Sequence, residues 1–213
     1  MGGHCMDTIA STADAVVVIL AAGLSTRMGR RKPDLPWLDG HTLLSHVRRT
    51  VDEAGLPSIV VAGAPARAGD LINPQPEHGI SSSLKLGFEY VRRVVPDAAV
   101  GVMLADQPFV SSDDIRAVYR RFRERAAGVH AVRPRYRGVP GHPVFFDQSW
   151  DALIASLAGD EGLGRLFKSR TDALWLDREA LGRPDPAFDV DTPDAYERAV
   201  QWAKGGLEGH DGK

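Results

Sequence analysis

Short apolar runs alternate along this chain with segments in which apolar residues recur every three or four positions. The β-branched run AVVVILA at positions 15–21 is the clearest apolar run, and it predicts a buried strand over 16–20. Strands that alternate with helices are typical of a mostly parallel sheet with helices on both faces. Further strands are predicted at 59–62, 100–104, 129–133, 143–146 and 173–176.

The segments with helical period begin or end at recognisable residues. Ser111 and Asp114 form a capping box ahead of an amphipathic stretch. Near the end of the chain, Thr192 followed by Pro193 has the chemistry of a helix N-terminus. The stretch after the Ser111 capping box begins at Ile115 and stops before Gly128. Two other apolar stripes begin at Leu44 and Leu84 and stop before Gly55 and Pro96.

The length of 213 residues is enough for one α/β domain with a substantial core. We expect this domain to cover 15–203, with a flexible lead over 1–14 and a flexible tail over 204–213. The formal net charge of -2 predicts no general attraction to nucleic acid or to an anionic membrane. The single cysteine, Cys5, allows no internal disulfide, and no apolar run is long enough for a membrane span, so we expect a cytoplasmic protein.

The segment AGLSTRMGRRK, which follows the first predicted strand, has the composition of a phosphate-binding loop. Gly23 and Gly29 let backbone N–H groups approach a polyanion, and Arg27 and Lys32 supply positive charge. Neither the P-loop string nor the dinucleotide motif G-x-G-x-x-G occurs in the chain. The loop therefore predicts a site for a nucleoside triphosphate that differs from both common types.

Acidic residues follow two other predicted elements. Asp106 follows the apolar run VGVML after one alanine, and Asp189 and Asp191 lie in FDVDTPDAY. Ligands of a parallel sheet bind at the carboxyl ends of its strands, and Mg²⁺ prefers one or two carboxylates with phosphate oxygens and water. We therefore predict a magnesium site at Asp106 and Asp191, with Asp189 beside it. The alternative is that Asp106 caps a turn and Asp191 caps its helix.

Two further segments combine turn residues with polar side chains. HGISSSLKLG places three serines after Gly79 at the start of a helix, where free N–H groups can bind a base or a phosphate. A plain helix cap would account for only one of these serines. RGVPGHPVFF places His142 in a Gly-Pro turn, where the alternative role is to bond turn carbonyls.

These segments resemble, in order, the motifs of one enzyme family. LAAGLSTRMGRRK matches the nucleotidyltransferase signature LAAGxSxRMGxxK, and within that class it resembles the molybdenum cofactor cytidylyltransferase (MobA-like) family. HGISSSLKLG, LADQP, GVPGHPVFF and DVDTPDAY follow in the family's order. The resemblance implies a single-domain, three-layer α/β/α Rossmann-like fold of the nucleotidyltransferase type, with a mostly parallel mixed sheet.

The resemblance also implies roles for individual residues. Arg27, Lys32 and Asp106 would be catalytic, and Asp106, Asp191 and Asp189 would bind Mg²⁺. The acceptor would lie against Gly141, His142 and Pro143. The nucleotide would be bound by Leu20, Ala21, Ala22, Gly23, Ser25, Gly29, Gly79, Ser81 and Ser82.

The implied reaction is magnesium-dependent nucleotidyl transfer from CTP to the phosphate of molybdopterin, which gives the cytosine dinucleotide cofactor and pyrophosphate. CTP is favoured over GTP because this chain reads LAAG where the guanylyl branch reads LAGG, so the Ala22 methyl narrows the base pocket. The product would serve a molybdoenzyme of the xanthine dehydrogenase type. The chain departs from the family at Pro33 and Asp34, and at Gly164, where arginine is usual.

Two other functions stay open from the sequence. A nucleotidyltransferase of this fold could use a sugar phosphate or another small phosphate, because fold and triphosphate loop do not determine the acceptor. Some relatives are described as nicotine-blue-type oxidoreductases, and a cofactor carrier without turnover is also conceivable. The absence of G-x-G-x-x-G counts against a redox function.

Overall fold

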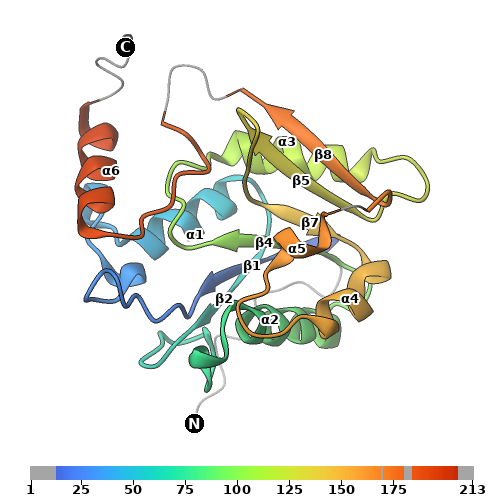
Figure 1. The fold of residues 1–213 in the computed structure, drawn as a ribbon, viewed down its shortest axis with the longest axis horizontal. Coiled ribbons are helices and arrows are strands. Elements are labelled where there is room, and N and C mark those ends of the chain that lie inside the picture. Colours follow the sequence, from blue (N-terminus) through green and yellow to red (C-terminus); the bar gives the residue numbers. More distant parts are fainter. Residues whose placement is uncertain (1–12, 169, 180–183, 206–213) are drawn as a thin grey trace.

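An eight-stranded mixed sheet forms the centre of the fold (Figure 1). The computed structural model describes residues 13–168, 170–179 and 184–205. Most of the predicted lead, with Cys5, and most of the predicted tail therefore lie outside the described residues. None of the helices in the described part of the chain has the length and apolar character needed to cross a bilayer.

The strand order across the sheet is β3-β2-β1-β4-β7-β5-β6, and β8 pairs with β5. β1 is parallel to β2 and β4, β2 to β3, and β5 to β8, whereas β7 runs antiparallel to both β4 and β5. The prediction of a mixed, mostly parallel sheet is thus confirmed. The strands are β1 Ala15–Ala21, β2 Ser58–Ala62, β3 Leu71–Ile72, β4 Ala99–Leu104, β5 Ala131–Tyr136, β6 Val139–Pro140, β7 Val144–Phe146 and β8 Ala173–Arg178.

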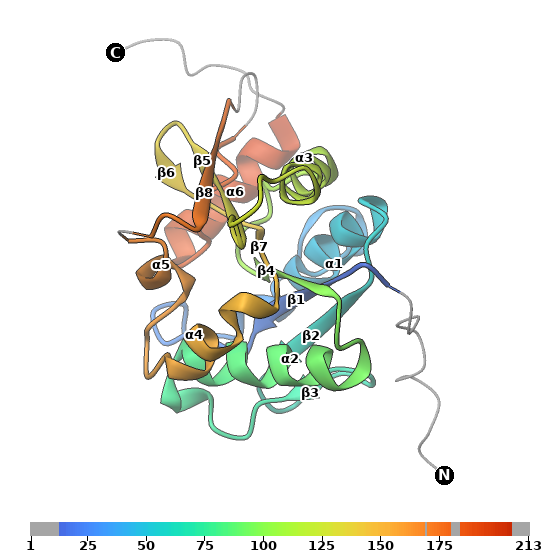
Figure 2. The same cartoon turned by 90° about the vertical axis from the view of Figure 1, so that its right-hand side faces the viewer.

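Helices cover both faces of the sheet. Figure 2 shows α1 and α3 on one side and α2 and α4 on the other, which makes the predicted three layers. The helices are α1 Leu43–Glu53, α2 Ile80–Val94, α3 Ser112–Arg123, α4 Asp151–Ser156, α5 Leu163–Leu166 and α6 Pro193–Gly205. Short 3₁₀ turns lie at Lys32–Asp34, Leu38–Gly40, Pro76–His78 and Gln148–Trp150.

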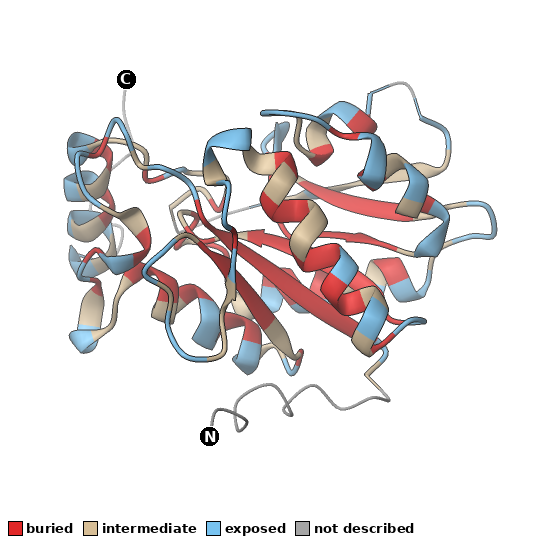
Figure 3. Ribbon diagram, turned by 90° about the horizontal axis from the view of Figure 1, so that it is seen from below, coloured by how far each residue is buried: buried red, intermediate tan, exposed pale blue. Residues whose placement is uncertain are grey.

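The central strand β1 is buried on both faces, as Figure 3 shows for the strands between the helices. Val16 and Val18 belong to the apolar cluster on the side of α2, whereas Val17 and Ile19 belong to the cluster on the side of α1 and α3. Because side chains alternate along a strand, a strand covered on both faces needs apolar residues at every position. This explains the unbroken run AVVVILA.

A third apolar cluster lies beside α6, apart from the two faces of the sheet. It contains Met28 from the loop after β1, Val190 from the segment before α6, and Ala199 from α6 itself. α6 begins as predicted, since Thr192 Oγ1 accepts a hydrogen bond of 3.2 Å from the N–H of Ala195. This cluster therefore brings the glycine-rich loop and the segment with Asp189 and Asp191 to the same end of the molecule.

The remaining predicted elements differ from the structure mainly at their ends. The Ser111 capping box of α3 is present, but α3 ends at Arg123 and not just before Gly128. The predicted apolar stripe that begins at Leu84 belongs to α2, and this helix begins four residues earlier, at Ile80. α6 extends to Gly205 and so includes the first two residues of the predicted tail.

Candidate active site

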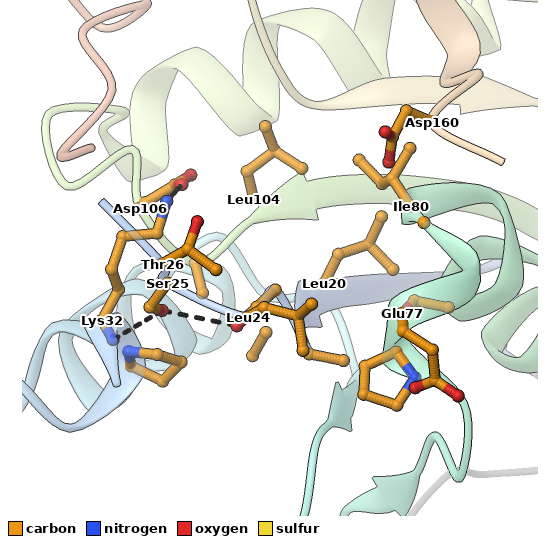
Figure 4. A pocket seen from close by; sticks show the side chains of 18 residues that line it. Leu20, Leu24, Ser25, Thr26, Lys32, Glu77, Ile80, Leu104, Asp106 and Asp160 are labelled. Atoms are coloured by element: carbon orange, nitrogen blue, oxygen red, sulfur yellow. Dashed lines mark hydrogen bonds and ion pairs between the residues drawn. The ribbon is translucent and has the colours of Figure 1, made fainter. Parts of the chain in front are cut away.

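A cavity of about 390 Å³ opens where β1 and β4 end (Figure 4). Leu20 and Leu104, near the ends of these two strands, form part of its wall. Lys32 and Asp106 lie at one end of the cavity, and Asp160 and Glu77 lie at the other. Among the predicted nucleotide-binding residues, Leu20, Ala21, Ala22, Gly23, Ser25 and Gly79 line it.

The loop after β1 is folded back so that Lys32 returns to the cavity. The carbonyl oxygen of Ser25 accepts hydrogen bonds from the N–H groups of Met28 and Gly29, at 3.0 and 3.2 Å. Ser25 Oγ accepts a further hydrogen bond of 3.1 Å from the N–H of Lys32. Met28 is buried in the third apolar cluster and anchors the loop. Local hydrogen bonds and one buried side chain thus determine where Lys32 points.

Gly23 lies in the cavity wall, although the protein does not need a glycine there for its own packing. A Cβ atom added at Gly23 would have no protein atom within 4 Å. Gly29 is different, because its φ of +71° favours glycine, and it does not line the cavity. The open space beside the Gly23 backbone fits a ligand that approaches the main chain closely, as a phosphate group does.

The side chains of Lys32, Asp106, Asp191 and Arg27 form one cluster of charges. Lys32 Nζ donates to Asp106 Oδ2 at 2.5 Å and to Asp191 Oδ1 at 2.8 Å. Arg27 donates to the other oxygen of Asp191 at 2.8 Å, but its side chain is 69% exposed and does not line the cavity. Asp106 and Asp191 therefore share the Lys32 ammonium, and their role as metal ligands stays a prediction.

The electrostatics of the cluster hold Lys32 charged. Burial lowers the pKa of Lys32, but the attraction of Asp106 and Asp191 outweighs it and the net pKa is raised. Burial acts to raise the pKa of Asp191, yet its bonds to Lys32 and Arg27 leave that pKa below the usual range. The pKa of Asp189 is raised, first by burial and then by the charges of Asp106 and Asp191.

Asp106 has a free coordination position. Its Oδ1 atom is buried and has no hydrogen-bond partner among the described residues. The backbone N–H of Val190 donates to the carbonyl oxygen of Asp106 at 2.9 Å and keeps Asp191 close. Within the described ranges, no group of three or more His, Cys, Asp or Glu side chains forms a ready metal centre. A buried, unpartnered carboxylate oxygen fits a divalent cation that takes its other ligands from phosphate and water.

Asp189 is hydrogen-bonded to Gln107, which is buried and also contacts His142. Its Oδ1 accepts a hydrogen bond of 2.9 Å from Gln107 Nε2, and Gln107 Oε1 lies 3.0 Å from Nδ1 of His142. Burial, together with the charge of Arg133, lowers the pKa of His142 to about 3, so its ring is neutral and Nδ1 donates to Gln107. His142 thus orients the Gln107 amide, which in turn donates to the carboxylate of Asp189.

The predicted acceptor residues Gly141, His142 and Pro143 are buried and do not line the cavity. Gly141 has a clear packing reason, because a Cβ atom there would lie 2.5 Å from the ring of Tyr136. The backbone of this turn is held by Arg133, whose Nε donates to the carbonyl oxygen of Gly141 at 3.0 Å. Gln107 links this turn to the carboxylate cluster.

The three serines at the start of α2 have different surroundings. Ser83 lines the cavity, whereas Ser81 and Ser82 do not. Ser82 Oγ donates to the carbonyl oxygen of Gly79 at 2.8 Å, and the N–H of Ser81 donates to the carbonyl oxygen of Gly159 at 3.1 Å. Ser81 and Ser82 therefore hold the helix start in place, and Ser83 is the serine that faces the site.

Sequence reasoning assigned no site role to several residues that the structure places here. Gln107 lies beside Asp106 in the motif LADQP, so its position in the chain was an available signal. Asp160 belongs to GDEGLG and lines the cavity, as do Glu77 and Thr26. Pro33, one of the departures from the family pattern, also lines it, in the turn Lys32–Asp34.

Comparisons with known proteins find a matching family model and a similar sequence. The family model of the MobA-like NTP transferase domain matches residues 17–174, which include the loop after β1, Asp106 and Asp160. Purine catabolism protein PucB of Bacillus subtilis (strain 168) is 29% identical over 200 residues, which cover 84% of this chain and 93% of PucB.

Solved structures are similar over nearly the whole described fold. Rv0371c from Mycobacterium tuberculosis H37Rv is 27% identical, with a TM-score of 0.72, and the match covers 88% of this chain and 98% of that chain. A complex of Rv0371c with manganese is 26% identical, with a TM-score of 0.69 and the same coverage. These solved structures therefore share the overall fold of this chain.

Proposed function

This chain belongs to the MobA-like NTP transferases, and from that premise we propose that it transfers a cytidylyl group from CTP to the phosphate of molybdopterin. The products are the cytosine dinucleotide form of the cofactor and pyrophosphate. The observation that carries the proposal is the placement of Lys32 between Asp106 and Asp191 at one end of a glycine-walled cavity.

The reaction needs no nucleophile from the protein. One oxygen of the acceptor phosphate forms a bond to the α-phosphorus of the triphosphate. The bond between the α-phosphorus and the oxygen that bridges to the β-phosphorus breaks, and pyrophosphate leaves with that oxygen. The barrier arises from repulsion between anions and from charge that grows on the leaving group, so positioning and cationic stabilisation supply the catalysis.

The residues of the cavity fit these tasks. Lys32 in the cavity wall, and Arg27 beside the cavity on Asp191, bind phosphate oxygens of the triphosphate and stabilise the charge on the departing pyrophosphate. The backbone beside Gly23 and Ser25 offers N–H groups to the same oxygens, with open space in front of Gly23. Gly79 and Ser83 lie farther along the wall and bind the nucleoside.

A divalent cation, which we propose to be Mg²⁺, belongs at Asp106 and Asp191. Without it, Asp106, Asp189 and Asp191 would repel a triphosphate that Lys32 and Arg27 attract. The unpartnered Oδ1 of Asp106 supports this assignment, as does the manganese complex of Rv0371c. Held by Asp106 and Asp191, such a metal would supply positive charge to offset that of the phosphates. Gln107 and His142 hold Asp189 in position beside the ligands.

Three finer points of the proposal rest on sequence. The methyl group of Ala22 is in the cavity wall and supports the smaller base of CTP against GTP. The name of PucB, purine catabolism protein, supports a molybdoenzyme of the xanthine dehydrogenase type as the recipient of the product. We propose that the acceptor binds on the side of the cavity nearest the turn at Gly141, His142 and Pro143, which contacts the carboxylate cluster through Gln107. We propose that the reaction takes place in the cytoplasm.

The direct test is product formation. Purified protein would be incubated with magnesium, molybdopterin and one radiolabelled nucleoside triphosphate at a time. We expect a labelled dinucleotide and pyrophosphate with CTP. Absence of product with every triphosphate, and with a panel of sugar phosphates as acceptors, would contradict nucleotidyl transfer. A larger thermal stabilisation by GTP than by CTP, each with magnesium, would contradict the cytidylyl assignment alone.

A further inference from the structure

Two acidic side chains line the cavity at the end away from Lys32. Asp160 and Glu77 both belong to its wall, and neither forms a hydrogen bond or ion pair with any described residue. Figure 4 shows Leu20 and Leu104 between this end and Lys32. The cavity therefore has cations and metal ligands at one end and carboxylates without a counter-charge at the other.

Asp160 is held closely against the start of α2. Its Oδ1 lies 2.6 Å from the position that a Cβ atom on Gly79 would occupy. The preceding residue, Gly159, accepts a hydrogen bond of 3.1 Å from the N–H of Ser81, which ties the loop to the helix. Only glycine at position 79 permits this approach, because the same Cβ would also lie 2.4 Å from the Gly159 backbone. The loop that carries Asp160 is therefore held against the start of α2, in the wall of the cavity.

The two carboxylates differ in direction. Figure 4 shows the Asp160 carboxylate turned toward Leu104 and the Glu77 carboxylate turned away from Leu20. The walls between them and Lys32 are apolar, formed by Leu20, Leu104 and Ile80. A flat base fits between such walls with one polar edge toward Asp160.

The distribution of charge determines how a nucleotide lies in the cavity, if the proposed function holds. A triphosphate is repelled by Asp160 and Glu77 and attracted by Lys32, so the phosphates lie at the Lys32 end and the base at the Asp160 end. An ionised carboxylate only accepts hydrogen bonds. The group of the base that meets Asp160 must therefore be a donor.

We propose that Asp160 selects bases that carry an exocyclic amino group, and that it accepts a hydrogen bond from N4 of cytosine. Uracil has the same shape but presents the O4 oxygen at that position, which would face the carboxylate as a second acceptor. Asp160 is thus the residue that separates CTP from UTP. Ala22 acts on a different choice, between a pyrimidine and a purine.

The test compares dissociation constants for CTP and UTP, measured with magnesium by isothermal titration calorimetry. The proteins are the native chain, the Asp160→Asn variant and the Glu77→Gln variant. Both variants remove one negative charge from the same end of the cavity, so Glu77→Gln is the matched control. Because Asp160 is exposed and bonds to no described residue, its variant should fold normally, and circular dichroism checks this.

We expect the native protein to bind CTP at least about tenfold more tightly than UTP. Asp160→Asn should reduce that ratio to about one or reverse it, because the asparagine amide can donate to O4 of uracil. Glu77→Gln should change both affinities together and keep the ratio. Equal binding of CTP and UTP by the native protein, or an unchanged ratio in Asp160→Asn, would overturn the role of Asp160 and leave nucleotidyl transfer standing. Failure to bind any nucleoside triphosphate would overturn both.

Discussion

Replacing Lys32 by methionine removes the cation that joins Asp106 and Asp191. The ammonium donates to both carboxylates, at 2.5 and 2.8 Å, and the Lys32 side chain is only 16% exposed. Hydrogen bonds between charged groups contribute about 1.5–3 kcal/mol each. Asp191 is 32% exposed, so water replaces part of the lost interaction. We therefore expect Lys32→Met to lower the free energy of unfolding by about 2 kcal/mol at neutral pH.

The same variant should bind a divalent metal more tightly than the native protein does. The Lys32 ammonium lies against both Asp106 and Asp191, so its positive charge repels a cation bound at the same two carboxylates. Loss of one nearby positive charge should raise the affinity for Mn²⁺ by roughly tenfold or more. Nucleotidyl transfer should nevertheless fall by about 10²–10³-fold, because Lys32 no longer stabilises charge on the phosphates.

The assay combines urea denaturation, with and without Mn²⁺, and calorimetric titration of the metal. Lys168→Met is the control, because Lys168 is exposed and lies outside the charge cluster. Added Mn²⁺ should restore more stability to Lys32→Met than it adds to the native protein or to the control. The reasoning is wrong if Lys32→Met unfolds at the same urea concentration as the native protein and binds Mn²⁺ with the same affinity.

Three other variants test separate parts of the structure. Asp106→Asn should keep the fold but weaken Mn²⁺ binding at least about tenfold and slow transfer by about 10³-fold; native transfer rates would remove Asp106 from the site. Burial lowers the pKa of His142 to about 3 in the folded protein, whereas the unfolded chain keeps a pKa near 6.5. Above pH 6.5 the histidine is neutral in both states. As the pH falls from 6.5 toward 3, the unfolded chain takes up a proton that the folded protein does not, and the free energy of unfolding falls. Between pH 7.5 and 5.5 the native protein should therefore lose about 1.4 kcal/mol more unfolding free energy than His142→Asn, and parallel losses in urea titrations would refute this. Gly87→Ala should destabilise the fold by about 1–3 kcal/mol, because the new Cβ would lie 2.4 Å from Val18 and 2.9 Å from Val61; an unchanged melting temperature would show that α2 can move away from the sheet.

Elements with a strong local signal were predictable from the sequence. β1 is an unbroken β-branched run, and the capping box of Ser111 with Asp114 is present as predicted. The elements that were missed are short. A two-residue strand such as β3 or β6, or a four-residue helix such as α5, contains too few residues to show a hydrophobic period. Their existence depends on neighbouring strands and loops.

Residues that are close together in sequence also predicted only part of the site. The glycines and cations of the loop after β1 are close in sequence, so the phosphate end was predictable from composition alone. The other end was not. Ser83 faces the cavity and Ser81 does not, because the direction of each side chain follows from how α2 packs against β1 and β2. Asp160 reaches the wall only because Gly79 lets its loop approach.

What the sequence by itself determined is the set of elements with local signals, the glycine-rich loop and the choice of acidic residues. What only the tertiary structure decided is which of these groups meet. Asp106 follows β4 and Asp191 precedes α6, and they share Lys32 because Met28 and Val190 are buried in the same apolar cluster. Burial of that cluster is non-local, and it has no counterpart in the spacing of residues along the chain. The charge cluster at the cavity is therefore a consequence of packing beside α6.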